Sequence, residues 1–161
     1  MATTVTASGN HVTGAEHHEL GFIRTYIFST DHKMIAKQFL VASLAFLLLG
    51  GLLAAVIRWQ LGFPGQSIPF IGGLFSETTA PGGIILPEFY NSLVTMHGTF
   101  MIFFAIMPLL VGVFGNLLIP LQIGAPDMAF PKLNMLSFWL AVPAGLMMLA
   151  SFFTVGGAAG S

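Results

Sequence analysis

The stretch "NSLVTMHGTFMIFFAIMPLLVGVFGN", residues 91–116, decides the fold class, because it is long, apolar and free of Asp, Glu, Lys and Arg. Its one ionisable side chain is that of His97. A helix of about twenty apolar residues crosses the hydrocarbon core of a bilayer, and charged side chains are costly at that depth. The stretch therefore predicts a transmembrane helix that carries a single imidazole.

The composition of the whole chain agrees with a membrane protein. Of its 161 residues, 55% are hydrophobic and 7% are charged, whereas about a quarter of the residues are charged in soluble domains. The formal net charge is −1, so no basic surface is expected and we predict no nucleic-acid partner. The chain has no cysteine, which excludes disulfides, thiolate metal sites and a cysteine nucleophile.

Two further charge-free segments have the length of a membrane span, so we expect an all-α membrane protein with three transmembrane helices. The segment between the first two spans is interrupted by Pro and Gly every few residues, which predicts a loop outside the bilayer, packed on the protein surface. The predicted order is a cytoplasmic amino-terminal segment (1–37), a span (38–57), an outer loop (58–91), a span (92–118), a cytoplasmic loop (119–135), a span (136–155) and a short end (156–161).

Basic residues predict the orientation. Lys33 and Lys37 precede the first span and Lys132 lies in the second loop, whereas the first loop has only Arg58, at its edge. Because loops rich in Lys and Arg stay inside, the amino terminus is expected in the cytoplasm. The polar start lacks the features of a cleaved signal peptide. The final "GGAAGS" has no charge or cap, which is expected of one piece of a longer polypeptide.

His97 has two interpretations. It is a neutral histidine hydrogen-bonded to a neighbouring helix, or it is an axial ligand of a haem iron, for which imidazole is a common ligand. In the second case Met101, Phe103 and Phe104 would supply apolar walls, and the small Gly98 would let a flat ring approach the backbone. The three spans contain no other histidine, so a second axial ligand would come from elsewhere.

Arg58 lies at the same predicted outer level as His97. It is an interfacial arginine that extends to lipid headgroups, or it donates hydrogen bonds to a haem substituent. In the second span, Pro108 removes a backbone donor and predicts a kink. Gly112 and Gly115 predict close contacts between helices.

Asp127 is the only acid in the second loop, within "IGAPDMAFP". It is a solvated carboxylate or a helix cap, or it is a proton entrance, because Asn116 and Asn134 flank the same mouth of the predicted bundle. Carboxamides hold ordered water without titrating, which suits a path that begins at a carboxylate.

Several motifs together resemble one family. "STDHKMIAKQFL", "VIRWQLGFPG", "YNSLVTMHGTFMIFFAIMP" and "GVFGNLLIPLQIGAPDMAFPKLNMLSFWL" are similar to the amino-terminal third of subunit I of the haem-copper terminal oxidases, in the branch with a D-type proton pathway. The similarity covers nearly everything from about Phe28 onward. It implies that the three spans are the first part of a twelve-helix bundle.

The resemblance also implies roles for the candidate residues. His97 matches the axial ligand of the low-spin haem, expected to be haem a, and Arg58 matches an arginine at the edge of that haem. Asp127 matches the cytoplasmic entrance of the D pathway, and Asn116 and Asn134 match asparagines around its first waters. The ligands of the high-spin haem and of copper would lie downstream of this chain.

The resemblance further implies a reaction and partners. The complete enzyme would reduce O2 to water and pump protons across a bacterial cytoplasmic membrane, assembled from the remainder of subunit I, subunits II and III and membrane lipid. Pro126 and Met128 are similar to members that use cytochrome c as electron donor. Gln60 stands where many members have an acid that helps to bind a calcium or sodium ion, which argues against that site here. A quinol oxidase and a non-catalytic membrane scaffold remain the alternatives.

Overall fold

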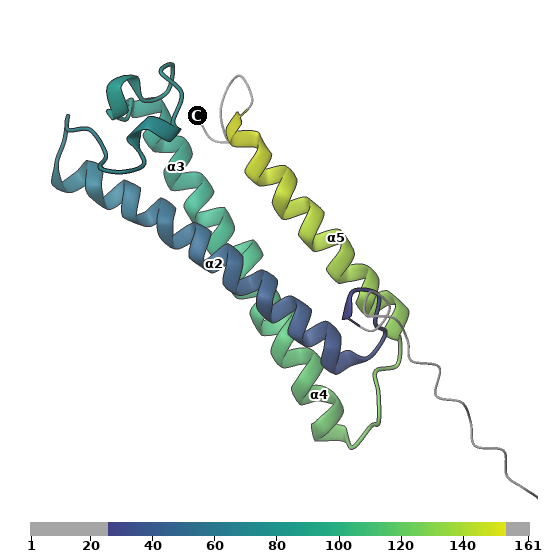
Figure 1. Cartoon of the computed structure of the whole chain (residues 1–161). Helices are drawn as coiled ribbons and strands as arrows, with labels where there is room; N and C mark the ends of the chain where they lie inside the picture. The colour runs from purple at the N-terminus through teal and green to yellow at the C-terminus, as the bar shows by residue number, and fades with distance from the viewer. Residues whose placement is uncertain (1–25, 154–161) are drawn as a thin grey trace, which may run out of the picture.

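Residues 26–153 are described by the computed structural model, and they form helices and connecting loops with no strand in that range. Three helices are long and apolar enough to cross a membrane. The first helix crosses the second and packs against it, and the third runs beside the pair (Figure 1). The prediction of an all-α membrane protein with three spanning helices is confirmed.

The first helix, α2 (His32–Gly62), begins where a side chain caps it. Asp31 is the N-cap, and its Oδ1 accepts a hydrogen bond of 3.1 Å from the backbone N–H of Lys33. Such a cap satisfies one of the free N–H groups of the first turn. The predicted span at 38–57 lies inside this longer helix. Arg58 consequently lies on the last turns of α2, and not in a loop.

The second long helix is continuous from Pro87 to Ile123 but changes its winding. It starts as α3 (Pro87–Thr99), with proline in the first turn, where its missing N–H costs nothing. Its middle has π-helical hydrogen bonding over Phe100–Ile106 and Pro108–Gly115, and it ends as α4 (Asn116–Ile123). The sequence predicts a kink at Pro108, whereas the structure has a long stretch of altered winding on both sides of it.

The helix α4 ends at a glycine that adopts a left-handed backbone. Gly124 has φ 68°, and the N–H of Ala125 donates to the carbonyl of Pro120 at 3.0 Å. Left-handed glycines of this kind are frequent helix terminators because they have no Cβ to clash. The third helix, α5 (Pro131–Ala150), follows this loop and continues into a short 3-10 turn at Ser151–Phe153.

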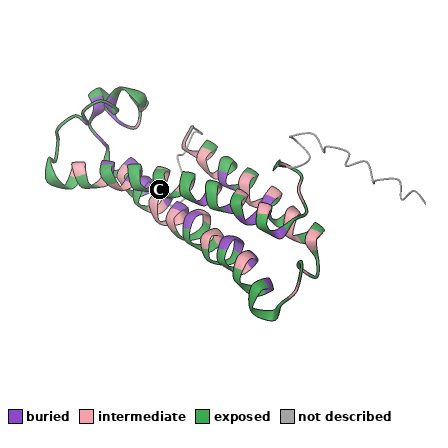
Figure 2. Ribbon diagram, turned by 60° about the horizontal axis from the view of Figure 1, so that its bottom comes forward, coloured by how far each residue is buried: buried purple, intermediate pink, exposed green. Residues whose placement is uncertain are grey.

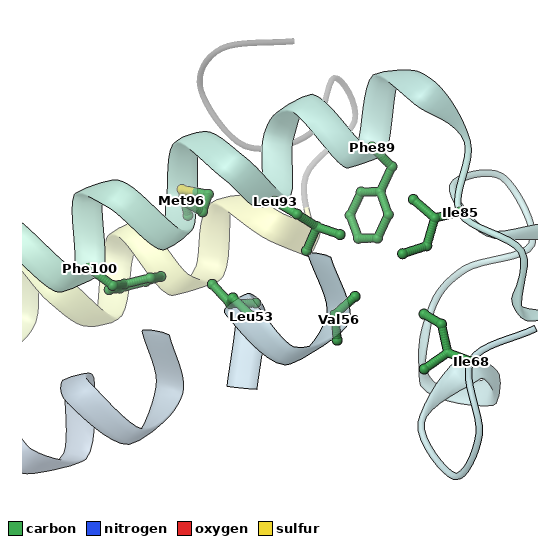
Figure 3. Close-up of a cluster of buried hydrophobic side chains, with 8 residues drawn as sticks. All are labelled: Leu53, Val56, Ile68, Ile85, Phe89, Leu93, Met96 and Phe100. Carbon is green, nitrogen blue, oxygen red and sulfur yellow. The ribbon is translucent and has the colours of Figure 1, made fainter. Parts of the chain in front are cut away.

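The loop between α2 and α3 packs onto one end of the bundle, which we call the loop end. Two short 3-10 turns, Gly72–Leu74 and Pro81–Gly83, shape this loop, and its Ile68 and Ile85 join a buried cluster with residues of α2 and the second helix (Figure 3). The cluster consists of Leu53, Val56, Ile68, Ile85, Phe89, Leu93, Met96 and Phe100.

A second buried cluster lies nearer the other end, which we call the Asp127 end. It contains Ile35, Phe39, Val113 and Phe138. A Cβ on Gly112 would lie 2.5 Å from Cγ of Phe39, so the glycine permits the close approach of the second helix to α2, as predicted. The same prediction for Gly115 stays a prediction, because among the described residues a Cβ there would meet only its own helix, at 3.9 Å.

Most of the apolar surface of the three helices faces outward (Figure 2). Only 11% to 22% of the residues in the most apolar window of each helix are buried. Side chains such as Leu48, Val111 and Met147 are exposed, which suits contact with lipid or with further membrane helices. How far each helix lies in the bilayer stays a prediction, and residues 1–25 and 154–161, at the two predicted ends, lie outside the described residues.

Candidate functional site

The structure brings His97 and Arg58 together in one groove near the loop end. The groove has a volume of about 610 Å³ and lies between the last turns of α2 and α3, the first part of the second helix. Because α2 extends to Gly62, its Arg58 faces the same space as His97 of α3. His97 lies about 15 Å along the axis from the start of its helix, at a rise of about 1.5 Å per residue. The lining consists of Ala54, Ile57, Arg58, Leu61, Gly62 and His97.

A backbone carbonyl orients the imidazole. Nδ1 of His97 lies 2.9 Å from the carbonyl oxygen of Gly50. A carbonyl oxygen only accepts hydrogen bonds, so Nδ1 carries the proton and donates it. Nε2 is then the nitrogen with the free lone pair, and a bond of this kind fixes the tautomer and ring direction of metal-binding histidines. The hydrogen bond to a neighbouring helix that the first interpretation expects is present, and it leaves Nε2 directed away from that helix, so the haem-ligand interpretation stays a prediction.

Gly50 permits this contact because it has no side chain. A Cβ at that position would lie 2.8 Å from Sδ of Met101 on the second helix. None of the three residues expected to form apolar walls beside a haem, Met101, Phe103 and Phe104, lines this groove. Phe104 packs against the rings of Phe46 and Phe100, and the groove wall is supplied by Ala54, Ile57 and Leu61 of α2.

The residues of the groove fit a haem. They offer one imidazole nitrogen with a free lone pair, one guanidinium and several apolar side chains, and the volume is within the usual range for ligand pockets, about 300 to 1,000 Å³. A Cβ on Gly98 would meet nothing within 4 Å, so the backbone beside His97 is open to a flat ligand. Within residues 26–153 no ion pair involves Arg58.

A second polar site lies at the Asp127 end. Oδ1 of Asp127 accepts a hydrogen bond of 2.9 Å from Nδ1 of His32, the first residue of α2, and one of 2.7 Å from the backbone N–H of Met128. His32 is buried, whereas the side chain of Asp127 is 48% exposed. A second carboxylate oxygen, from Asp31, lies 3.5 Å from the same Nδ1. The exposed carboxylate is thus tied to a buried imidazole.

These contacts favour the ionised form of Asp127. The N–H of Met128 and then the imidazole of His32 hold the pKa of this carboxyl below its ordinary value of 3.8, against a smaller opposing effect of burial. Hydrogen bonds to a carboxylate stabilise its charged form. Asp127 is therefore a carboxylate at neutral pH. It does not cap α5, because the N-cap of that helix is Phe130 and has no side-chain cap.

Asn116 and Asn134 take different positions around this end. Asn116 is buried, and its Nδ2 donates to the carbonyl of Gly112 at 2.7 Å. Nδ2 of Asn134 donates to Sδ of Met128 at 3.2 Å. Met128 directly follows Asp127 in the sequence, so Asn134 contacts the neighbour of the carboxylate. No direct hydrogen bond among the described residues joins the two asparagines to the carboxylate, so water would have to connect them.

His32 is the site residue that sequence reasoning missed. It stands in "STDHKMIAKQFL", one of the stretches that carry the family resemblance. The only local feature that could have marked His32 as a site residue is its position next to Asp31, just before the first span. A solvated residue at the start of a helix has the same position. The partner Asp127 is 95 positions away in the sequence, so only the folded chain shows that they meet.

Comparison with known proteins identifies the family. Residues 34–161 match the family described as cytochrome c and quinol oxidase polypeptide I. A cytochrome c oxidase subunit 1 from Thermostichus vulcanus is 44% identical over 135 residues, and one from Synechocystis sp. is 39% identical over 139 residues. These alignments cover 84% and 86% of this chain but 22% of each relative. The chain thus spans about a fifth of the length of these relatives, and it belongs to the polypeptide I family of cytochrome c and quinol oxidases.

Proposed function

We propose that this chain is part of the catalytic subunit of a proton-pumping respiratory oxidase that reduces O2 to water with electrons from cytochrome c. Its contribution is one axial ligand of a low-spin haem, haem a by resemblance, and the entrance of a D-type proton pathway. The observation that carries the proposal is the His97 groove, where a correctly protonated imidazole and a guanidinium share one apolar space.

In this proposal His97 binds the haem iron through Nε2. When bound, the haem supplies a one-electron carrier, whose potential depends on its axial ligands and on nearby charge. The carbonyl of Gly50 keeps the imidazole in the ligating tautomer. Arg58, which lines the same groove, would donate hydrogen bonds to a haem substituent and add a positive charge beside the ring. The second axial ligand, the high-spin haem and copper belong to the remainder of subunit I.

Asp127 is the proposed proton entrance. Its carboxylate is half exposed and ionised at pH 7, so its negative charge would attract protons to this mouth, and transient protonation would pass them inward. The His32 imidazole keeps the carboxylate in one orientation. Asn116 and Asn134 are proposed to hold the first waters behind it, since amide groups bind water and do not titrate.

The two sites lie toward opposite ends of the helices, which suits an enzyme that separates charge across a membrane. We place the amino terminus and Asp127 on the cytoplasmic side of a bacterial membrane and the His97 groove toward the outer side, following the positive-inside rule. The expected partners are subunits II and III, cytochrome c and membrane lipid. Both named relatives above are cytochrome c oxidases, which favours cytochrome c over a quinol as donor.

The test is a pair of optical spectra of the purified complex that contains the complete subunit. A reduced-minus-oxidised spectrum with a low-spin haem band, and a carbon monoxide difference spectrum with a separate reactive haem, are expected. O2 consumption with reduced cytochrome c exceeding that with a quinol supports the proposed donor, and the reverse order identifies a quinol oxidase. Absence of both haems from an intact complex leaves a non-catalytic scaffold.

A further inference from the structure

A smaller pocket lies at the Asp127 end, between the start of α2 and the end of α4. It has a volume of about 220 Å³. Leu117, Leu121 and Ala125 supply apolar atoms, together with two prolines, and His32 and Lys33 supply polar ones. The pocket thus combines an apolar wall from α4 with a cation from α2.

The ammonium of Lys33 is available to an anion. Lys33 is exposed, and its side chain has no hydrogen-bond or ion-pair partner within residues 26–153. Neither nearby acid lines the pocket. Asp31 accepts from the backbone N–H of Lys33 and Asp127 is bonded to His32 and Met128, so both carboxylates are already engaged.

The position of the pocket selects the ligand. α2 has 31 residues, about 46 Å at a rise of about 1.5 Å per residue, which exceeds the hydrocarbon thickness of about 30 Å. A helix of this length extends beyond the hydrocarbon core, and with the orientation proposed above we infer that its first turn reaches the level of the lipid headgroups. The pocket is smaller than the usual range for a whole ligand, about 300 Å³ and above. It suits a headgroup and the first part of an acyl chain whose remainder stays in the bilayer.

We propose that this pocket binds an anionic phospholipid, with its phosphate on Lys33 and the start of an acyl chain against Leu117 and Leu121. A lysine near a membrane surface attracts anionic headgroups through its charge, and the leucine side chains of α4 offer apolar contact to an acyl chain. The bound lipid would come from the membrane leaflet that surrounds the Asp127 end. The proposal does not depend on the haem role given above, but the pocket shares His32 with the proposed proton entrance.

The probe is phosphatidylglycerol with a photoreactive diazirine on its acyl chain, incorporated into nanodiscs with the complete oxidase complex. After irradiation, labelling of the peptide that spans residues 117–126 is measured by mass spectrometry and divided by the total label on the subunit. We expect Lys33→Gln to lower this ratio at least about fivefold, because it removes the one lysine that lines the pocket and with it the charged hydrogen bond to the phosphate. Lys37→Gln is the matched control, since it is an exposed lysine of the same helix outside the pocket, and it should leave the ratio unchanged.

A second variant tests the pocket without changing charge. Ala125→Leu places a larger side chain at the pocket and should also lower labelling of this peptide. Elution of the variant complex as one species in size-exclusion chromatography is the check that the complex is intact. Phosphatidylcholine with the same diazirine chain should label this peptide at least fivefold less than phosphatidylglycerol. Equal labelling by the two lipids, no labelling by either, or an unchanged ratio in both pocket variants would overturn the proposal. Displacement of the label by inorganic phosphate would identify a soluble-anion site and also overturn it.

Discussion

The two ends of this bundle use a histidine in opposite ways. Near the loop end, His97 donates from Nδ1 to a neutral carbonyl, that of Gly50, and faces an apolar groove with Arg58. At the Asp127 end, His32 is buried and donates from Nδ1 to a carboxylate. A carbonyl partner fixes a tautomer and leaves Nε2 for a metal, whereas a carboxylate partner stabilises a charge. The partner of Nδ1 thus decides what the imidazole can do.

The largest expected effect is on haem content, when each of the two histidines is replaced by alanine in a separate variant. His97→Ala removes the proposed ligand and should lose the low-spin haem, one of the two haems of the complete enzyme. His32→Ala removes an imidazole from the opposite end and should retain both. Haem content per complex, measured as the pyridine haemochrome, distinguishes them. Equal haem content in both variants would contradict the proposal that His97 binds a haem and His32 does not.

Asp127→Asn is expected to have the next largest effect, on turnover and not on haem. The amide keeps the size of the side chain but cannot carry a proton, and a positioned proton-transfer group contributes at least about a hundredfold in many enzymes. We predict a fall in O2 consumption of more than tenfold with an unchanged haem spectrum. Undiminished turnover with unchanged proton release per electron would remove Asp127 from the proposed pathway.

Glycine substitutions compare the packing at the two ends. Gly112→Ala forces a Cβ to within 2.5 Å of the Phe39 ring, whereas Gly50→Ala meets the flexible thioether of Met101 at 2.8 Å. Overpacking typically costs about 1 to 3 kcal/mol, and we expect Gly112→Ala near the upper value and Gly50→Ala near the lower. Gly51→Ala is the control, because its Cβ would meet nothing within 4 Å.

Thermal unfolding of the complex in detergent measures these three variants side by side. The midpoint should fall most for Gly112→Ala and least for Gly51→Ala. Gly50→Ala should in addition shift the haem absorption band, since it moves the carbonyl that orients His97. An equal loss of stability in all three variants would contradict the assigned contacts.

The smallest effect concerns pH. Because the pKa of Asp127 is lowered in the folded chain, its ionised form contributes stability above the ordinary value of 3.8, and this contribution is lost as pH falls through the folded pKa. The side chain is 48% exposed, so the contribution is small. Infrared titration of the carboxyl band should show this pKa rise toward its ordinary value in His32→Ala. No change in that variant would mean that His32 does not hold the carboxylate.

The fold was largely predictable, because charges mark where a chain cannot lie in lipid. The ends of the helices were not, since they depend on local caps: the Asp31 side chain starts α2 ahead of the apolar segment, and Gly124 stops α4 after it. This difference matters for the site. The extra turns of α2 bring Arg58 and Leu61 to the groove of His97.

The candidate residues are predicted from the sequence through resemblance and stay predictions, whereas their hydrogen-bond partners were not predicted at all. Nothing in the sequence relates His97 to the Gly50 carbonyl or His32 to Asp127, because these contacts join positions 47 and 95 apart. The α2 residues that line the groove were not predicted either, since hydropathy does not say which face of a helix points inward. Residues of α2 took the place expected for Phe104, which packs in an aromatic cluster.

The most direct test is the reduced-minus-oxidised spectrum of the purified His97→Ala complex, recorded before and after the addition of free imidazole. If Nε2 of His97 is the axial ligand, the low-spin band of the unmodified complex should be absent and should return when imidazole occupies the vacated position. A low-spin band that is present without imidazole, at its original position and intensity, would contradict the assignment of His97 as the haem ligand.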